Sequence, residues 1–135
     1  KAIVGSYRLL DKIYRFFTTD STALEYQSWT AKDNLSAIKT MHKTIRKVGE
    51  DIENMKFNTA IAAINIMVNG GIPTDPEDAH EWKSALIRLL QPFAPHMAEE
   101  CWSLLGNENS IYSTEWPEYI SAMTIDDEVQ IAIQI

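Results

Sequence analysis

The chain has 135 residues, of which 19 are acidic and 12 are basic, so its formal net charge at pH 7 is -7. This length fits one domain with its own core, and the acidic balance argues against a surface that binds nucleic acid indiscriminately. The sequence has no long apolar run and no basic leader followed by an apolar segment, which argues against a membrane span and a secretory signal.

The first segment, residues 3–17, has the spacing of an amphipathic helix with a broad apolar face. The centre of its predicted buried face is formed by Ile3, Tyr7, Leu10, Tyr14 and Phe17. The same face is widened by Leu9, Ile13 and Phe16. Arg8, Lys12 and Arg15 fall opposite the centre of this face, and we call them the first basic group.

Residues 18–33 are polar and lack a sustained period, which predicts a loop containing one turn, anchored by Trp29. A long helix is predicted from Asn34 to about Met55, because apolar residues recur there at steps of three and four. Its predicted buried side consists of Ile38, Met41, Ile45, Val48, Ile52 and Met55. The opposite side carries a second basic group, formed by Lys39, Lys43, Arg46 and Lys47.

Two interpretations of the second basic group stay open. The group is a solvated face compensated within the helix, Arg46 by Glu50 and Lys47 by Asp51, or it is a local stripe that binds RNA phosphates. Burial of the two apolar faces turns both basic groups outward. If the two helices pack side by side, the groups merge into one basic strip.

Residues 57–68 are apolar on nearly all sides, which predicts the most buried helix of the domain. Asn58 or Thr59 is its predicted start signal, and the run from Asn69 to Gly71 is its stop. Residues 70–76 are predicted to form a turn, after which Pro76 or Glu77 opens the next helix.

The sharpest pattern in the chain is a helix, a break and a second helix between residues 82 and 106. The first helix has an apolar stripe made of Trp82, Leu86, Leu89, Leu90 and Phe93. Pro92 and Pro95 interrupt this helix, and Pro95 is well placed to begin the next one. The second stripe consists of Met97, Cys101, Leu104 and Leu105, with Trp102 on its flank. Gly106 is the predicted C-terminal stop.

The second helix also carries residue types that bind metals. His96, Glu99, Glu100 and Cys101 lie within about one turn, but helical zinc signatures carry a second His, which is missing here. We therefore interpret His96 as a polar cap over the helix start. The single cysteine, Cys101, cannot form an internal disulfide and is predicted to be a buried thiol of a reduced, cytoplasmic protein.

The string from Leu89 to Gly106, with its Pro-Phe-Ala-Pro-His and Ala-Glu-Glu elements, resembles the helical domain that follows the catalytic core of class I aminoacyl-tRNA synthetases for large aliphatic amino acids. The run from Met41 to Asn65, which contains His-Lys-Thr-Ile and Phe-Asn-Thr-Ala-Ile-Ala, resembles the leucyl-tRNA synthetase family in particular. The same is true of the run from Ser113 to Tyr119. Isoleucyl, valyl and methionyl enzymes share a looser version of the first string.

The resemblance implies an all-α fold, an antiparallel bundle of about five helices of the anticodon-binding type, over residues 1–119. Ile111, Tyr112, Trp116 and Tyr119 are predicted to anchor the loop at its end. Residues 120–135 are then a linker and a short C-terminal strand, because residues 128–135 alternate apolar and polar side chains. In the family this strand opens a further domain, so we expect the chain to be a piece of a longer protein.

For function, the resemblance implies a tRNA-positioning domain whose parent enzyme joins leucine to tRNA(Leu) with ATP and Mg. The class I nucleotide motifs are absent from this sequence, so no catalytic, cofactor or metal-binding residue is assigned to it. The expected tRNA-binding residues are the two basic groups: Arg8, Lys12, Arg15, Lys39, Lys43, Arg46 and Lys47. Other expected partners are the remaining domains of the same synthetase. The fragment is expected to be a monomer with an unpaired strand edge that could self-associate, and no membrane contact is expected. The alternatives are an acidic helical protein-interaction module and the same domain of an isoleucyl, valyl or methionyl enzyme.

Overall fold

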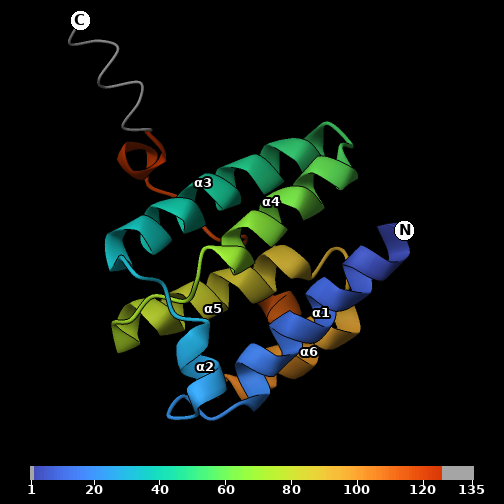
Figure 1. Ribbon diagram of the computed structural model, residues 1–135. Helices are drawn as coiled ribbons and strands as arrows, with labels where there is room; N and C mark the ends of the chain where they lie inside the picture. Colours follow the sequence, from blue (N-terminus) through green and yellow to red (C-terminus); the bar gives the residue numbers. More distant parts are fainter. Residues whose placement is uncertain (1, 126–135) are drawn as a thin grey trace, which may run out of the picture.

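A computed structural model describes the backbone of residues 2–125 and the side chains of residues 7–125. Within this part of the chain the fold is all-α, as predicted (Figure 1). The α-helices are α1 (Ala2–Thr18), α2 (Leu24–Ser28), α3 (Asn34–Glu53), α4 (Phe57–Asn69), α5 (Pro76–Leu90) and α6 (Pro95–Leu104). Two short 3-10 helices follow, η1 (Ile111–Ser113) and η2 (Ser121–Thr124).

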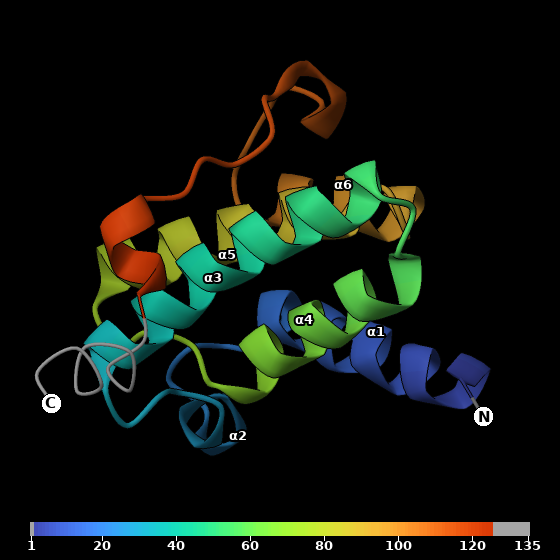
Figure 2. The same cartoon turned by 90° about the horizontal axis from the view of Figure 1, so that it is seen from above.

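The long helices α3, α4, α5 and α6 run in alternating directions, because each is joined to the next by a short connection (Figures 1 and 2). α3 and α4 form the most extensive helix pair, and α5 packs against both. The centre of the core is made of large side chains of α4 and α5 with no exposed surface, among them Ile64, Met67, Trp82, Leu86 and Leu89. The helical bundle predicted from the sequence is therefore present.

The break before α6 lies where the two prolines predict it. α5 begins with Pro76 behind an Asp75 N-cap, whose carboxylate accepts a hydrogen bond from the backbone N–H of Asp78 at 3.1 Å. α5 ends at Leu90, and α6 starts again at Pro95 and ends before Gly106, which has a φ of 104°. Local backbone chemistry thus accounts for both helix boundaries.

The buried face of α1 differs from the prediction. Its centre is Leu9, Ile13 and Phe16, whereas Tyr7 is 72% exposed and Tyr14 is half-buried. The phenyl ring of Phe16 contacts Trp82 of α5, with 5.9 Å between ring centroids. The helix is therefore rotated relative to the predicted face, because its partner helices cover the side that the sequence pattern treats as the flank.

Helix α4 is not the most buried helix, contrary to the prediction. One side packs into the core, but Ile66 is 65% and Phe57 is 45% exposed. The helix also starts at Phe57 without a side-chain cap, so neither Asn58 nor Thr59 is its start signal. An apolar composition does not require burial on every side, because a peripheral helix has neighbours on only part of its circumference.

Two further apolar residues lie outside the core although the sequence pattern places them inside it. α3 ends at Glu53, and Met55 follows in the turn to α4 with a φ of 59° and 74% exposure. In α6 the buried side chains are Ala98, Cys101 and Trp102, and Leu104 is 50% exposed. Both misplaced residues are at helix ends, where periodicity no longer determines which way a side chain points.

The predicted loop of residues 18–33 contains the short helix α2 and is anchored by Trp29, as predicted. The indole ring of Trp29 lies 5.1 Å from the ring of Phe16 and 6.0 Å from that of Tyr26, measured between centroids. Residues 29–31 also pair with the segment that follows α4, since the Ala31 N–H donates to the Ile72 carbonyl at 2.8 Å. This pairing connects the loop to the α3–α4 hairpin.

The segment after α6 returns along α3. Ile111 is buried, as predicted for an anchor, but Tyr112 is 67% exposed and does not anchor the loop. η2 packs against α3, and residues up to Ile125 are described. The strand predicted at residues 128–135 lies outside the described residues.

Candidate functional site

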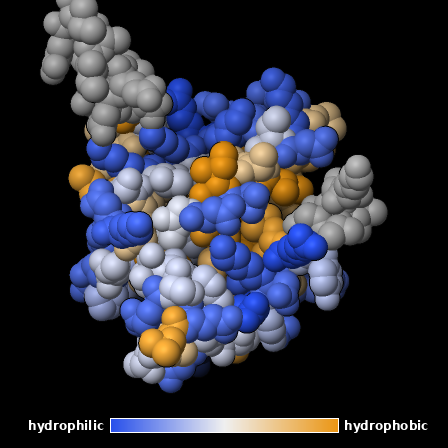
Figure 3. Space-filling model, viewed as in Figure 1, coloured by the Kyte–Doolittle hydropathy of each residue, from blue (hydrophilic) through white to orange (hydrophobic). Residues whose placement is uncertain are grey.

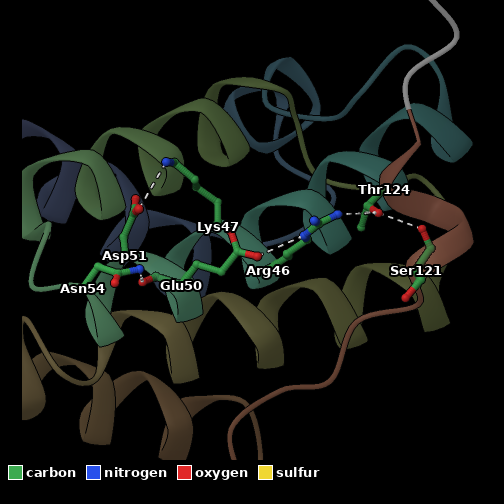
Figure 4. A network of polar contacts seen from close by, with 7 residues as sticks. All are labelled: Arg46, Lys47, Glu50, Asp51, Asn54, Ser121 and Thr124. Atoms are coloured by element: carbon green, nitrogen blue, oxygen red, sulfur yellow. Dashed lines mark hydrogen bonds and ion pairs between the residues drawn. The ribbon is translucent and has the colours of Figure 1, made fainter. Parts of the chain in front are cut away.

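The second basic group lies on α3, where Arg46 and Lys47 form ion pairs inside the helix. The Arg46 Nε is 3.2 Å from Glu50 Oε2, and the Lys47 Nζ is 3.1 Å from Asp51 Oδ1. Figure 4 shows that the Arg46 guanidinium also reaches Thr124 of η2, at 3.4 Å. The two compensating pairs predicted from the sequence are therefore present. Lys39 and Lys43 of the same group are half-buried.

Asp51 is a buried carboxylate that links α3 to α4. Its side chain is almost fully buried, and Oδ2 accepts a hydrogen bond from the Thr59 hydroxyl at 2.7 Å. The Thr59 hydroxyl, followed by Lys47, holds the pKa of Asp51 below its usual value. Lys47 therefore has a structural role, because it compensates the charge of the buried Asp51 carboxylate.

The first basic group lies on α1 and has mixed surroundings. Arg8 is exposed, whereas Arg15 pairs with Glu25 of α2 and lies 5.8 Å from the centroid of the Trp29 ring. The Lys12 Nζ donates to Asn69 Oδ1 at the end of α4, at 3.2 Å. Lys12 therefore points toward the same end of the hairpin that contacts Trp29.

The structure does not merge the two basic groups into one strip. α4 lies between α1 and α3 in both views of the ribbon (Figures 1 and 2). The first group accordingly borders α4 and the α2 segment, and the second borders η2. Instead, Lys12 lines a pocket together with Lys32, which belongs to neither basic group.

A hollow of about 410 Å³, which we call the Lys12–Lys32 pocket, lies between α1, the segment from α2 to α3, and the end of α4. Its lining is mostly polar and comes from three stretches of sequence: Lys12, residues 28–33 with Ser36, and residues 68–71. Sequence reasoning missed Lys32, because this residue lies in a polar loop without helical periodicity. Lys32 also lies far in the sequence from Gly70 and Gly71, so only the fold places these residues around one pocket.

A second hollow, of about 430 Å³, has the opposite electrostatic character. It lies between α3 and the segment before η2, and the half-exposed rings of Trp116 and Tyr119 border it. Arg46 is its one basic lining residue, whereas Glu50, Glu53 and Glu118 are acidic. This hollow is poorly suited to a phosphate group, because the acidic side chains outnumber the arginine.

Reactive chemistry is limited in the described part of the chain. No group of three or more His, Cys, Asp or Glu side chains is arranged to hold a metal ion among residues 2–125. Burial, with a smaller contribution from Glu100, raises the pKa of the Cys101 thiol to about 12. His96 is exposed at the start of α6. The N-cap residue of this helix is Ala94, and no side chain caps the helix there, so the predicted capping role of His96 has no direct support.

No helix between residues 2 and 125 is long and apolar enough to cross a membrane.

Comparison with known proteins connects this bundle to tRNA ligases. Residues 77–135 match the family described as the anticodon-binding domain of tRNA ligase. The fold is also similar to part of the LeuRS of Agrobacterium radiobacter in a ternary complex with tRNA and LeuAMS, with a TM-score of 0.59 and 27% sequence identity. Residues 77–135 are thus similar to the anticodon-binding domain of tRNA ligases.

The chain corresponds to a small part of the LeuRS that it resembles. The match covers 87% of the present chain and 16% of the LeuRS chain. The family match includes α5, the break and α6, which are the elements that carry the sharpest sequence pattern. The structural similarity extends the relation to most of the chain.

Proposed function

We propose that this chain is the tRNA-positioning domain of a leucine–tRNA ligase, whose parent enzyme attaches leucine to tRNA(Leu) using ATP and Mg in the cytoplasm. The observation that carries the proposal is the similarity to LeuRS over 87% of the chain. The sequence runs from Met41 to Asn65 and from Ser113 to Tyr119 support the leucyl member over the isoleucyl, valyl and methionyl ones.

The domain binds tRNA through local basic surface, since the chain as a whole carries a charge of -7. On α3, the candidates for phosphate contacts are Lys39, Lys43, Arg46 and Lys47. Arg46 and Lys47 are partly neutralised by carboxylates of the same helix. On α1 the candidates are Arg8 and Lys12, because Arg15 is paired with Glu25.

The experiment is a titration of the chain with tRNA(Leu) at several salt concentrations, with tRNA(Ile) as the comparison. We expect tighter binding of tRNA(Leu) and a steep fall of affinity with salt. Replacing Lys39 and Lys43 together by Gln should lower the magnitude of the salt slope by about one to two units, if both contact phosphates. The matched control is Lys1→Gln with Lys56→Gln, which changes the net charge equally outside both basic groups.

Equal binding of both tRNAs would show that this domain holds tRNA through phosphate contacts, which carry no base information, and it would keep a tRNA-binding domain. Absence of salt-dependent binding to either tRNA would reject the tRNA-positioning role of this chain. The chain by itself should show no leucine-dependent exchange of pyrophosphate into ATP, because its sequence lacks the class I nucleotide motifs. Pyrophosphate exchange above a no-protein control would contradict the assignment of catalysis to other parts of the parent enzyme.

One observation favours the second candidate function, a protein-interaction module. Apolar side chains gather over α4 on a mostly hydrophilic face (Figure 3), and Ile66 of α4 is 65% exposed. If the chain is instead an interaction module, it should bind a protein partner with an affinity that does not depend on salt, and it should not bind tRNA. Ile66→Glu should then abolish binding of that partner.

A further inference from the structure

The Lys12–Lys32 pocket has the composition of a site for a small anion. Its volume of about 410 Å³ lies within the usual range for ligand pockets. The charged lining residues are Lys12, Lys32 and Asp33, so the pocket carries one net positive charge in a chain with a net charge of -7. It is therefore a local exception to the acidic character of the chain.

The walls of the pocket are held in place by close backbone packing. Gly71 has a φ of 98°, and a Cβ atom at this position would lie 2.7 Å from the Cα and N atoms of Ala31. The two segments are hydrogen-bonded in both directions, Ala31 N–H to the Ile72 carbonyl and Ile72 N–H to the Trp29 carbonyl, each at 2.8 Å. A pocket with walls fixed in this way needs little reorganisation to bind a ligand.

The hydrogen-bond donors left over in the pocket belong mainly to the two lysines. The hydroxyls of Ser28 and Thr30 already donate to the carbonyls of Glu25 and Gln27. Lys12 uses a donor on Asn69, and an ammonium group has three. Ser36 is in the first turn of α3, so the positive end of this helix adds to the field of the ammonium groups.

We propose that the Lys12–Lys32 pocket binds one backbone phosphate of the tRNA, with Lys12 and Lys32 as the charged donors. The proposal rests on the proposed tRNA-binding function and assigns it a specific contact. A phosphodiester carries a single negative charge, which matches the net charge of the pocket. Arg8 lies one helical turn before Lys12 on α1 and is exposed, so it is positioned to meet the neighbouring stretch of the same backbone.

The test compares Lys32→Gln and Lys12→Gln with the matched control Lys56→Gln, an exposed lysine in the turn between α3 and α4. Each pocket variant should lower the magnitude of the salt slope for tRNA by about one unit, and weaken binding about eight-fold at 0.1 M salt. Lys32→Arg should restore both values, because it keeps the charge. The control should leave both near the wild-type values, and thermal unfolding should confirm that all variants are folded.

A second measurement identifies the bound group. Phosphate-ethylation interference on tRNA should show a blocked position with the wild type and with Lys56→Gln that is lost with Lys32→Gln. Calorimetric titration with inorganic phosphate distinguishes a free anion from an RNA phosphate. Two results together would overturn the proposal in favour of a free-phosphate site. Inorganic phosphate would bind to the wild type but not to Lys32→Gln, and Lys32→Gln would bind tRNA as tightly as Lys56→Gln does.

The remaining outcomes separate this inference from the proposed function. If the wild type binds tRNA and the pocket variants behave like Lys56→Gln, the pocket assignment is wrong and the tRNA-binding function stands. If the wild type does not bind tRNA in a salt-dependent way, the proposed function and the pocket assignment fail together.

Discussion

The Nδ1 atom of His42 accepts a hydrogen bond from the backbone N–H of Ile120, with 3.1 Å between the two nitrogens. This bond joins the middle of α3 to the segment that leads into η2, and the contact of Arg46 with Thr124 adds a second link one turn farther along α3. His42 is 4% exposed. The link requires an unprotonated Nδ1, so it depends on a neutral imidazole.

The stability of the domain should therefore fall as His42 becomes protonated. Burial lowers the pKa of His42 below its ordinary value of 6.5, and Glu81 opposes this shift. Below pH 6.5 the unfolded chain binds the proton more readily than the folded one, so stability decreases as the pH falls from 6.5 toward the folded-state pKa. NMR titration of His42 should give a midpoint below 6.5.

The contribution of His42 is isolated by substitution. His42→Asn keeps a hydrogen-bond acceptor near the Nδ1 position without a titrating group, so the difference in urea midpoint between pH 7.5 and pH 5.5 should shrink. His80→Asn, at an exposed position of α5, is the matched control and should leave that difference unchanged. An His42 midpoint at or above 6.5 would contradict the prediction.

Removal of the Thr59 hydroxyl should raise the pKa of Asp51. The Thr59 hydroxyl is the main cause of the lowered Asp51 pKa. A carboxylate whose pKa is lowered by folding stabilises the fold at pH values above its unfolded-state pKa. This stabilisation is lost as the pH falls through the folded-state pKa. In Thr59→Val the Asp51 pKa, measured by NMR of its carboxyl carbon, should move upward, and acid unfolding should begin at higher pH. Thr18→Val removes a hydroxyl that bonds only a backbone carbonyl, and it should leave the Asp51 pKa unchanged.

Two leucines provide a matched test of the core. Leu89 has no exposed surface in α5, whereas Leu104 is 50% exposed at the end of α6. Leu89→Ala should cost roughly 2–5 kcal/mol of unfolding free energy, because it leaves a cavity. Leu104→Ala should cost less than about 1 kcal/mol, since solvent already covers half of the side chain. Similar losses for both variants in urea unfolding would show that the assigned core is wrong.

The thiol of Cys101 should be unreactive in the folded protein. With a pKa of about 12 and no exposed surface, it forms little thiolate and is inaccessible to reagents. Labelling with a disulfide reagent at pH 8 should therefore be slow without denaturant and fast in urea, with a rate that follows the opening of the helix. Equally rapid labelling in both conditions would place Cys101 on the surface.

Much of the architecture could be predicted from short stretches of sequence. The N-terminal boundaries of α5 and α6 follow from Pro76 and Pro95, and the end of α6 follows from Gly106. The ion pairs of Arg46 and Lys47 were also predictable, because residues four apart lie on the same side of a helix. All these effects act over a few residues of the chain, so they need no knowledge of tertiary structure.

Tertiary structure decided which parts of the broad apolar faces are covered and which distant residues meet. Tyr7 and Ile66 are exposed although each belongs to an apolar pattern, because α1 and α4 have neighbours on only part of their circumference. Lys12 and Lys32 line the same pocket because Gly71 packs against Ala31 at a distance that only a glycine allows. Periodicity shows that a helix has an apolar side, but the packing partners determine how the helix is rotated and what its polar side chains meet.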